Sequence, residues 1–375
     1  MATSRIFGAY PVVPVVKAEE IRPVFIRMSK NSKDDEMNMV GEPKTKRQHY
    51  VPQFFLRFFT DENGAFAVLH NKRLRHNVSP KSICYKNNLY ETHLSKGNED
   101  ALFPNSLENT LRSTEEMFAK RLREQYELIM GSLYEKRLGM NQEGYMRALI
   151  SSFIVSLVSR MPHEVAAAKD DVGKMIEVLK RNDARTIDEY VSNFHAAERE
   201  DFVDGSFDLE HVAESIAKVV RVFPLIAPES METKGKRLLD SLLNSSMHIL
   251  VTCQGHPFVG CSAPVIATDG NVLWMPMSSE ICVCYTNDDR HKFDGCSLNH
   301  KELRAVNKLI LSVDNTEYFF CSRPDYLKKD GYCGKVDNRT PQSLLAPDLD
   351  DLLARCRPLS ALPDVSSFVG GNRGV

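Results

Sequence analysis

The spacing of hydrophobic and polar residues changes twice along the chain. Residues 44–100 contain short runs in which apolar and polar side chains alternate, with turn residues between them, and this pattern predicts a β-hairpin or short meander. Residues 101–245 instead place apolar side chains at intervals of three, four and seven, which is typical of amphipathic helices. Residues 246–340 return to short β-branched and aromatic runs, with one helix at 299–313 among them. Strands grouped on both sides of a helical block predict an α+β fold with a C-terminal antiparallel or mixed sheet.

Two helices of the central block have the clearest signals. An apolar stripe through residues 105–138 predicts one long amphipathic helix. A more apolar run over residues 141–168 predicts a second helix that is buried on most sides, and Pro162 is expected to kink it or to start a new segment.

The same patterns suggest one folded domain with two flanking segments. Residues 1–43 show no sustained period and are expected to form a variable extension. We place a single α+β domain at residues 44–340, and the polar, proline-bearing residues 341–375 are expected to form a flexible tail.

Composition narrows the class of protein. The chain has 375 residues, of which 42% are apolar and 26% charged, as in ordinary globular proteins. No stretch reaches the roughly 18 uninterrupted apolar residues of a membrane-spanning helix, and no clear signal-peptide cleavage site follows the N-terminus. We therefore expect a cytoplasmic protein with no membrane partner, whose nine cysteines are reduced. Cys282 and Cys284 would share one face of a strand, where packing is favoured over a zinc site because a Cys-x-x-Cys hook is absent.

Charge adds a local feature that the net charge of −2 conceals. Between residues 44 and 86 there are nine lysine or arginine residues and only two acids. This excess predicts a surface for the phosphates of a nucleic acid, although a solvated face that balances acidic stretches elsewhere would give the same pattern. The candidate nucleic-acid contacts are Lys44, Lys46, Arg47, Arg57, Lys72, Arg73 and Arg75.

Four residues of the first two regions are candidates for chemistry. His49 lies beside the cationic segment, where it would serve as a metal ligand or general base, or simply form a hydrogen bond at the rim of a sheet. Glu108 and Glu115 are seven residues apart, so both face one side of the long helix, either as metal ligands or an acid/base pair or as part of a salt-bridged face. Arg160 ends the apolar helix, where it would neutralise the helix dipole or bind one of these glutamates.

Several segments, taken in order, resemble a bacterial family described as domain of unknown function 4238. The resemblance covers residues 46 to about 325, and its most specific part is His-Tyr-x-Pro followed by Leu-Arg-x-Phe. The segments are "HYVPQFFLRFF", "ICYKNNLYE", "SLENTLRSTEEMFAKRL", "FIVSLVSRMP", "FVGCSAPVI", "WMPMSSE" and "ELRAVNKLILS". The family pattern falls on His49, Tyr50, Pro52, Leu56, Arg57, Phe59, Tyr90, Glu108, Glu115, Arg160, Pro264, Pro276 and Asn307.

The resemblance implies a polar site between the helical block and the sheets. Some members look like single-gene defence factors against bacteriophage, which suggests a phage protein or a nucleic acid as partner. One hypothesis is a metal-dependent nuclease or phosphodiesterase, in which His49, Glu108 and Glu115 hold Mg²⁺ or Mn²⁺ and Arg160 and Asn307 assist catalysis. A second hypothesis is a non-enzymatic sensor or interaction protein in which the same residues form a buried network, and a third is a small-molecule or nucleotide hydrolase.

The chain departs from the family pattern in two places. Family members typically have Ser-Asp-Asn-Pro where this sequence has Cys261, Ser262, Ala263 and Pro264, and the glutamine expected before Arg160 is Leu157. If the missing aspartate binds metal or activates water, this protein has an altered mechanism or is inactive.

Overall fold

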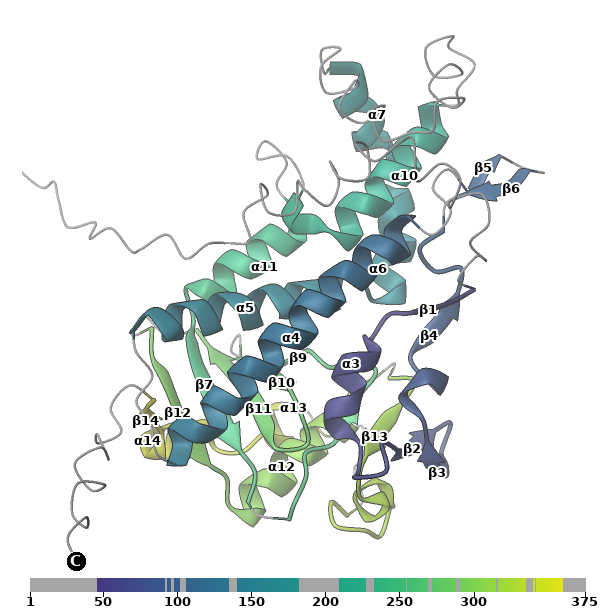
Figure 1. Cartoon of the computed structure of the whole chain (residues 1–375). Helices are drawn as coiled ribbons and strands as arrows, with labels where there is room; N and C mark the ends of the chain where they lie inside the picture. The colour runs from purple at the N-terminus through teal and green to yellow at the C-terminus, as the bar shows by residue number, and fades with distance from the viewer. Residues whose placement is uncertain are drawn as a thin grey trace, which may run out of the picture.

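A six-stranded mixed sheet lies at the centre of the molecule (Figure 1), in the strand order β14-β12-β7-β11-β10-β9. Neighbouring strands are antiparallel except β12 and β7, which are parallel. The strands are β7 (Ser246–Val251), β9 (Ile266–Thr268), β10 (Val272–Pro276), β11 (Ile281–Thr286), β12 (Phe293–Ser297) and β14 (Arg357–Pro358). The computed structural model describes residues 46–91, 93–95, 98–101, 106–134, 140–181, 209–226, 233–253, 255–268, 272–287, 291–314, 316–334, 340 and 342–359.

Helices cover both faces of this sheet. On one face the apolar helix α5 (Met140–Ser159), crossed by the long helix α4 (Ser106–Tyr134), packs against the side chains of Ile249 and Val283. On the other face, helices α12 (His300–Leu311) and α14 (Leu349–Arg355) cover Leu250 and both Cys282 and Cys284. All six residues of β7 and of β11 are buried, as expected for strands that are covered on both sides.

A second sheet joins the two ends of the fold. Its four strands, in the order β3-β2-β13-β8, pair the early hairpin with strands from the C-terminal region. The strands are β2 (Phe66–His70), β3 (Arg73–Val78), β8 (Gly260–Cys261) and β13 (Phe319–Cys321). Two short ribbons complete the strands, β1 (Arg47–His49) with β4 (Tyr85–Asn87) and β5 (His93–Ser95) with β6 (Asn98–Ala101).

The remaining helices are short turns, helices near the far end of α4 and α5, and one longer helix that runs alongside α5. They are α3 (Gln53–Leu56), η1 (Arg57–Phe59), η2 (Pro80–Ser82), α6 (Pro162–Ala166), η3 (Ala167–Asp171), α7 (Val172–Arg181), α10 (Leu209–Val222), η4 (Pro224–Ile226), α11 (Lys234–Leu243), η5 (Pro324–Leu327) and α13 (Gln342–Leu345). Across the described ranges, no helix combines the length and apolar character needed to traverse a lipid bilayer.

The α+β class and the order of strands, helical block and mixed sheet are confirmed. Pro162 starts the new helix α6, where the missing N–H of proline has no cost.

Two expectations were wrong in detail. Residues Gln53–Leu56, inside the region predicted to form a β-hairpin or meander, form a helical turn. The tail begins later than residue 341, because α14 and β14 pack on the central sheet, with Leu352 fully buried and β14 paired to β12. The extension 1–43 lies outside the described residues.

Candidate functional site

Arg160 is the centre of a buried polar cluster between β1, α4 and the end of α5. It follows Ser159, the last residue of α5, and precedes the Pro162 start of α6, so the turn between two helices fixes its backbone. Its side chain is 2% exposed and reaches across to the N-terminal part of α4. A guanidinium so deeply buried needs a full set of acceptors, because an unpaired buried charge is strongly destabilising.

Four contacts satisfy this guanidinium and its neighbour Tyr90. Arg160 Nη2 lies 2.6 Å from Glu115 Oε1 and donates to the backbone carbonyl of His49, also at 2.6 Å. Arg160 Nε donates to Tyr90 Oη at 3.2 Å, and that hydroxyl donates in turn to the same His49 carbonyl at 3.1 Å. The expected pairing of Arg160 with one of the α4 glutamates is therefore present. The arginine holds the main chain of His49 and makes no contact of this kind with its imidazole.

A second layer of hydrogen bonds fixes the segment around Tyr90. The buried Gln48 side chain donates to Glu91 Oε1 at 2.7 Å and accepts from the Tyr90 backbone N–H at 2.7 Å. Lys218, on α10, donates to the Glu91 carbonyl at 2.6 Å. Glu108 therefore lies near two other carboxylates, Glu91 and Glu115, and near the buried guanidinium of Arg160.

Burial, more than the neighbouring charges, changes the protonation of Glu108. Burial, with the nearby charge of Glu115 and in spite of Arg160, raises the pKa of Glu108 from its ordinary value of 4.5 to about 7. Its Oε2 atom is buried and has no hydrogen-bond partner among the described residues, and the same holds for Glu91 Oε2. A carboxyl group that is half protonated at neutral pH and has an unused oxygen is a candidate general acid or base.

The His49 imidazole faces a different environment. Burial and the charge of Arg160 lower the pKa of His49 to about 4, so the ring is neutral at pH 7. Its Nδ1 lies 3.4 Å from Gln53 Nε2, and its Nε2 has no hydrogen-bond partner among the described residues. The ring also lies 5.7 Å from the ring of Tyr85, on the side of the β1–β4 ribbon.

The structure does not assemble His49, Glu108 and Glu115 into a metal site. Throughout the described part of the chain, one group of three His, Cys, Asp or Glu side chains has its ligand atoms within 4.8 Å of one another, and it is a different group, discussed below. The physical reason is Arg160, because its guanidinium occupies the position beside Glu115 where a cation would be attracted. The glutamates do lie close together, as the spacing of seven predicted, but their counter-ion is an arginine.

Glu108 gives the site a testable pH dependence. The folded protein keeps a proton on Glu108 up to about pH 7, whereas the unfolded chain releases it near pH 4.5, so the contribution of Glu108 to stability falls as the pH rises through this window. Glu108→Gln is therefore expected to match the wild type at pH 4 and to be more stable by about 1–2 kcal/mol at pH 8, measured by urea unfolding.

Glu116→Gln, an exposed change on the same helix, is the matched control and should be neutral at both pH values. An equal difference between wild type and Glu108→Gln at pH 4 and pH 8 would contradict the assignment.

The β1–β4 ribbon and the β2–β3 hairpin lie on the same side of the molecule (Figure 1). Most of the candidate nucleic-acid residues lie on or beside these two ribbons and Arg57 lies in η1, and we call this set the cationic face. Lys46, Arg47, Arg57, Lys72, Arg73 and Arg75 are all exposed, and none of them forms an ion pair with another described residue, while Lys44 lies outside the described part. Residues 317–318 connect the two ribbons. Lys86 of β4 lies 2.8 Å from Glu317 Oε2, and the ring of Tyr318 stacks on His70 of β2 with centroids 4.7 Å apart.

Comparison with known proteins places these residues in one family. The sequence profile of a family described as protein of unknown function (DUF4238) matches residues 47–323, most of the chain. The chain belongs to the DUF4238 family. Neither a curated protein nor a solved structure gives a significant match.

Ser262, one of the two places where this chain departs from the DUF4238 pattern, has a clear structural role. Ser262 Oγ accepts the backbone N–H groups of Glu317 and Tyr318 at 3.0 and 3.1 Å. A carboxylate oxygen accepts such hydrogen bonds equally well, so the serine keeps the interaction that an aspartate would make here. This role requires no metal at position 262. Leu157, the other departure, is a buried core residue.

Asn307 of the DUF4238 pattern does not join the Arg160 cluster. It is fully buried on α12, where its side chain donates to the Pro257 carbonyl at 3.1 Å and accepts the Val259 N–H at 2.8 Å. Both ends of the amide are therefore used to hold the loop before β8. These contacts give Asn307 a structural role, and its expected catalytic role stays a prediction.

Sequence reasoning missed Gln48, Glu91 and Lys218. The signal for Gln48 was present, since alternation along β1 points Gln48 inward and turns Arg47 outward. Glu91 and Lys218 had no local signal, because their roles depend on α10 packing beside the segment after β4.

Proposed function

We propose that this DUF4238 protein binds single-stranded nucleic acid on its cationic face as part of defence against bacteriophage. The observation that carries the proposal is the set of exposed arginines and lysines without ion-pair partners on the β1–β4 ribbon and the β2–β3 hairpin, among described residues. Exposed cations without ion-pair partners among the described residues are available to phosphates, and binding them gains affinity from counter-ion release. The defence setting rests on the family resemblance.

Partly exposed rings beside these cations favour a single strand. The guanidinium of Arg47 lies 5.0 Å from the centroid of the Tyr85 ring, and Tyr318 stacks on His70. Aromatic rings interleaved with cations bind unpaired bases by stacking, which bases inside a duplex cannot offer.

Binding is tested by fluorescence anisotropy with labelled single-stranded RNA, single-stranded DNA and duplex DNA at several salt concentrations. The triple variant Arg47→Gln, Arg73→Gln, Arg75→Gln is expected to bind single strands about 10- to 100-fold more weakly, and its salt slope should fall by about 2.

The matched control removes three exposed cations from helices, Lys120→Gln, Arg123→Gln and Lys301→Gln, and should bind like the wild type. The proposal fails if the wild type binds no single strand, or if the two triple variants lose affinity equally.

A second function, cleavage of the bound strand, is favoured by one observation. Glu108 has a pKa of about 7 and an oxygen without a partner, which suits proton transfer at neutral pH. Cleavage is measured with RNA and DNA in the presence of Mg²⁺, Mn²⁺ or a chelator. Loss of cleavage with retained binding in Glu108→Gln supports an enzyme, whereas binding without cleavage in the wild type supports a sensor.

A further inference from the structure

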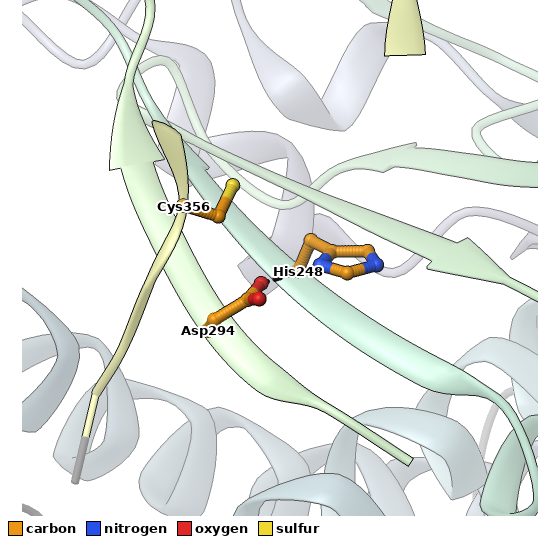
Figure 2. A group of neighbouring side chains, drawn as sticks. All are labelled: His248, Asp294 and Cys356. Atoms are coloured by element: carbon orange, nitrogen blue, oxygen red, sulfur yellow. Dashed lines mark hydrogen bonds and ion pairs between the residues drawn. The ribbon is translucent and has the colours of Figure 1, made fainter. Parts of the chain in front are cut away.

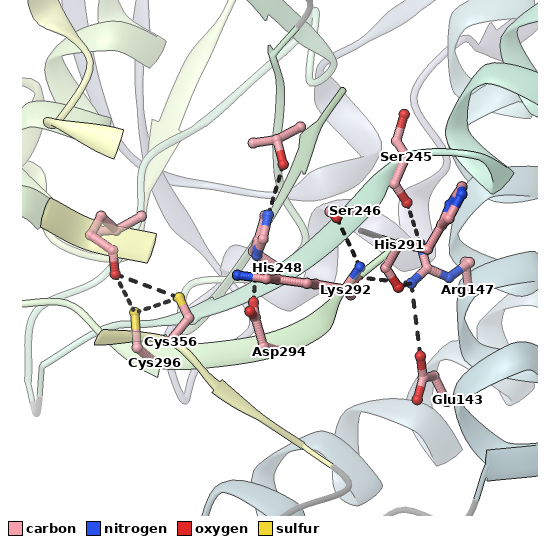
Figure 3. A network of polar contacts seen from close by, with 12 residues as sticks. Glu143, Arg147, Ser245, Ser246, His248, His291, Lys292, Asp294, Cys296 and Cys356 are labelled. Carbon is pink, nitrogen blue, oxygen red and sulfur yellow. Dashed lines mark hydrogen bonds and ion pairs between the residues drawn. The ribbon is translucent and has the colours of Figure 1, made fainter. Parts of the chain in front are cut away.

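We propose that a structural zinc ion is bound by His248, Asp294 and Cys356 (Figure 2), with Cys296 as the fourth ligand (Figure 3), between the central sheet and the C-terminal segment. None of these residues belongs to the Arg160 cluster or the cationic face. The donors come from three separate parts of the chain, β7, β12 and the residue between α14 and β14.

The registers of the strands bring the four side chains together. His248 and Asp294 are direct partners in the parallel β7–β12 pair, so both project from the same face of the sheet. Cys296 is two residues after Asp294 and shares that face. The antiparallel β12–β14 register pairs Gly295 with Arg357, and continuing it by one residue sets Cys356 opposite Cys296.

Three of the four donor atoms lie close together, and the fourth adjoins one of them. One ring nitrogen of His248, a carboxylate oxygen of Asp294 and Cys356 Sγ all lie within 4.8 Å of one another. Cys296 Sγ, which is not in that group of three, lies 3.3 Å from Cys356 Sγ (Figure 3). Tetrahedral ligands at ordinary zinc distances are about 3.3–3.8 Å apart. His248 Nδ1 and Asp294 are in direct hydrogen-bond contact, so binding would require them to separate by about 1 Å.

The site is buried and one end of the ligand set is already oriented. His248 is fully buried and Asp294 is 3% exposed, so the carboxylate requires a positive partner. The remaining imidazole nitrogen, Nε2, lies 2.8 Å from Thr286 Oγ1. In the ion-free protein Nδ1 donates to the Asp294 carboxylate. With the ion bound, Nδ1 would lose this proton and Nε2 would donate to Thr286 Oγ1, which is the arrangement that the outer partners of metal-bound histidines usually have.

Arg147 holds the beginnings of both strands in place. From α5, its guanidinium donates to the carbonyls of Ser245 at 2.5 Å and of Lys292 at 3.0 Å, the residues just before β7 and β12 (Figure 3). Gly295 lets the strands approach, since a Cβ at this position would lie 2.6 Å from the Ile249 carbonyl oxygen. The backbones of β7 and β12 are therefore held together, and only the side chains of His248 and Asp294 would have to move to admit the ion.

The donor chemistry selects zinc. One nitrogen, one oxygen and two sulfurs suit a borderline-soft ion in tetrahedral geometry, whereas Mg²⁺ and Mn²⁺ prefer sets of oxygen ligands. Four protein ligands leave no open position, so the ion would be structural and would attach the C-terminal segment to the sheet.

The test uses the full chain, purified under reducing conditions without chelator and freed of any histidine tag, and measures metal by mass spectrometry. We expect about one zinc ion per wild-type chain, and less than about a fifth of that in Cys356→Ala, which changes a half-buried residue at low risk to folding. Cys282→Ala is the matched control, because this buried thiol faces the same side of the sheet outside the ligand set, and it should keep its zinc.

Cobalt substitution gives a second measurement. Co²⁺ should produce a thiolate-to-cobalt charge-transfer band in the wild type and Cys282→Ala, and this band should be lost in Cys356→Ala. The proposal is overturned if the wild type holds no zinc even after incubation with ZnCl₂. It is also overturned if Cys282→Ala loses zinc as Cys356→Ala does, or if the wild type carries a Cys296–Cys356 disulfide in place of the ion.

Discussion

Replacing Arg160 with methionine is expected to lower the free energy of unfolding by about 3–5 kcal/mol, the largest effect of any single change in the Arg160 cluster. Methionine approximates the length of the arginine stem but has no donors. Glu115, the His49 carbonyl and the Tyr90 hydroxyl would each lose their contact with Arg160 inside the protein. The cost includes a carboxylate left near other carboxylates without its cation. Urea unfolding at pH 7 measures the change.

Arg112→Met is the matched control, because Arg112 is exposed on the same helix that carries Glu115, and it should alter stability by no more than about 0.5 kcal/mol. Arg160→Lys keeps the charge but cannot bridge a carboxylate, a carbonyl and a hydroxyl, so it should fall between the two. Equal stabilities of Arg160→Met and Arg112→Met would show that the network contributes nothing.

Asn307→Ala is expected to cost about 2–3 kcal/mol. The Val259 N–H and the Pro257 carbonyl would remain buried without the amide that pairs them, and an unpaired buried polar group is more costly than the hydrogen bond is worth. Thermal unfolding provides the measurement. Asn307 holds a loop that does not belong to the cationic face, so the affinity of the folded variant for nucleic acid should not change.

Asn244→Ala is the control for this substitution. Asn244 makes one exposed hydrogen bond at the end of α11, so its loss should cost about 0.5 kcal/mol or less. If Asn307→Ala kept wild-type stability but weakened binding of a single strand, the structural role assigned to Asn307 would be wrong.

Periodicity predicted the parts of the fold in which one physical signal dominates. The α4 stripe and the apolar α5 run are long, so the 3.6-residue repeat outweighs local exceptions, and Pro162 marks the start of α6 for a steric reason. The conformation of the segment around Pro52 was predicted less accurately. The run after Pro52 is rich in aromatic residues that favour strands, yet Phe55 and Leu56 are buried from a single helical turn, because packing against α5 and its Phe153 decides their conformation.

Sequence patterns predicted only part of the candidate site. The seven-residue spacing placed Glu108 and Glu115 on one side of α4, and the position of Arg160 at the edge of an apolar helix indicated an acidic partner. No spacing reveals that the guanidinium would take the place expected for a metal, or that the main chain of His49 would be the group held. The tail boundary failed for a similar reason, since β14 is two residues long and gains its order from β12.

The pairing of β2 with β13 affects how the chain is made. Leu69 and its partner Phe319 are 250 residues apart, so a ribosome that adds about 5–20 residues per second needs roughly 12–50 s between them. Throughout this interval one hydrogen-bonding edge of β2 lacks its partner strand β13. The side chains of Phe66 and Val68, which are buried in the finished protein, also lack part of their packing. Nascent chains should therefore depend on a chaperone until the C-terminal third emerges, and slower translation should increase their aggregation.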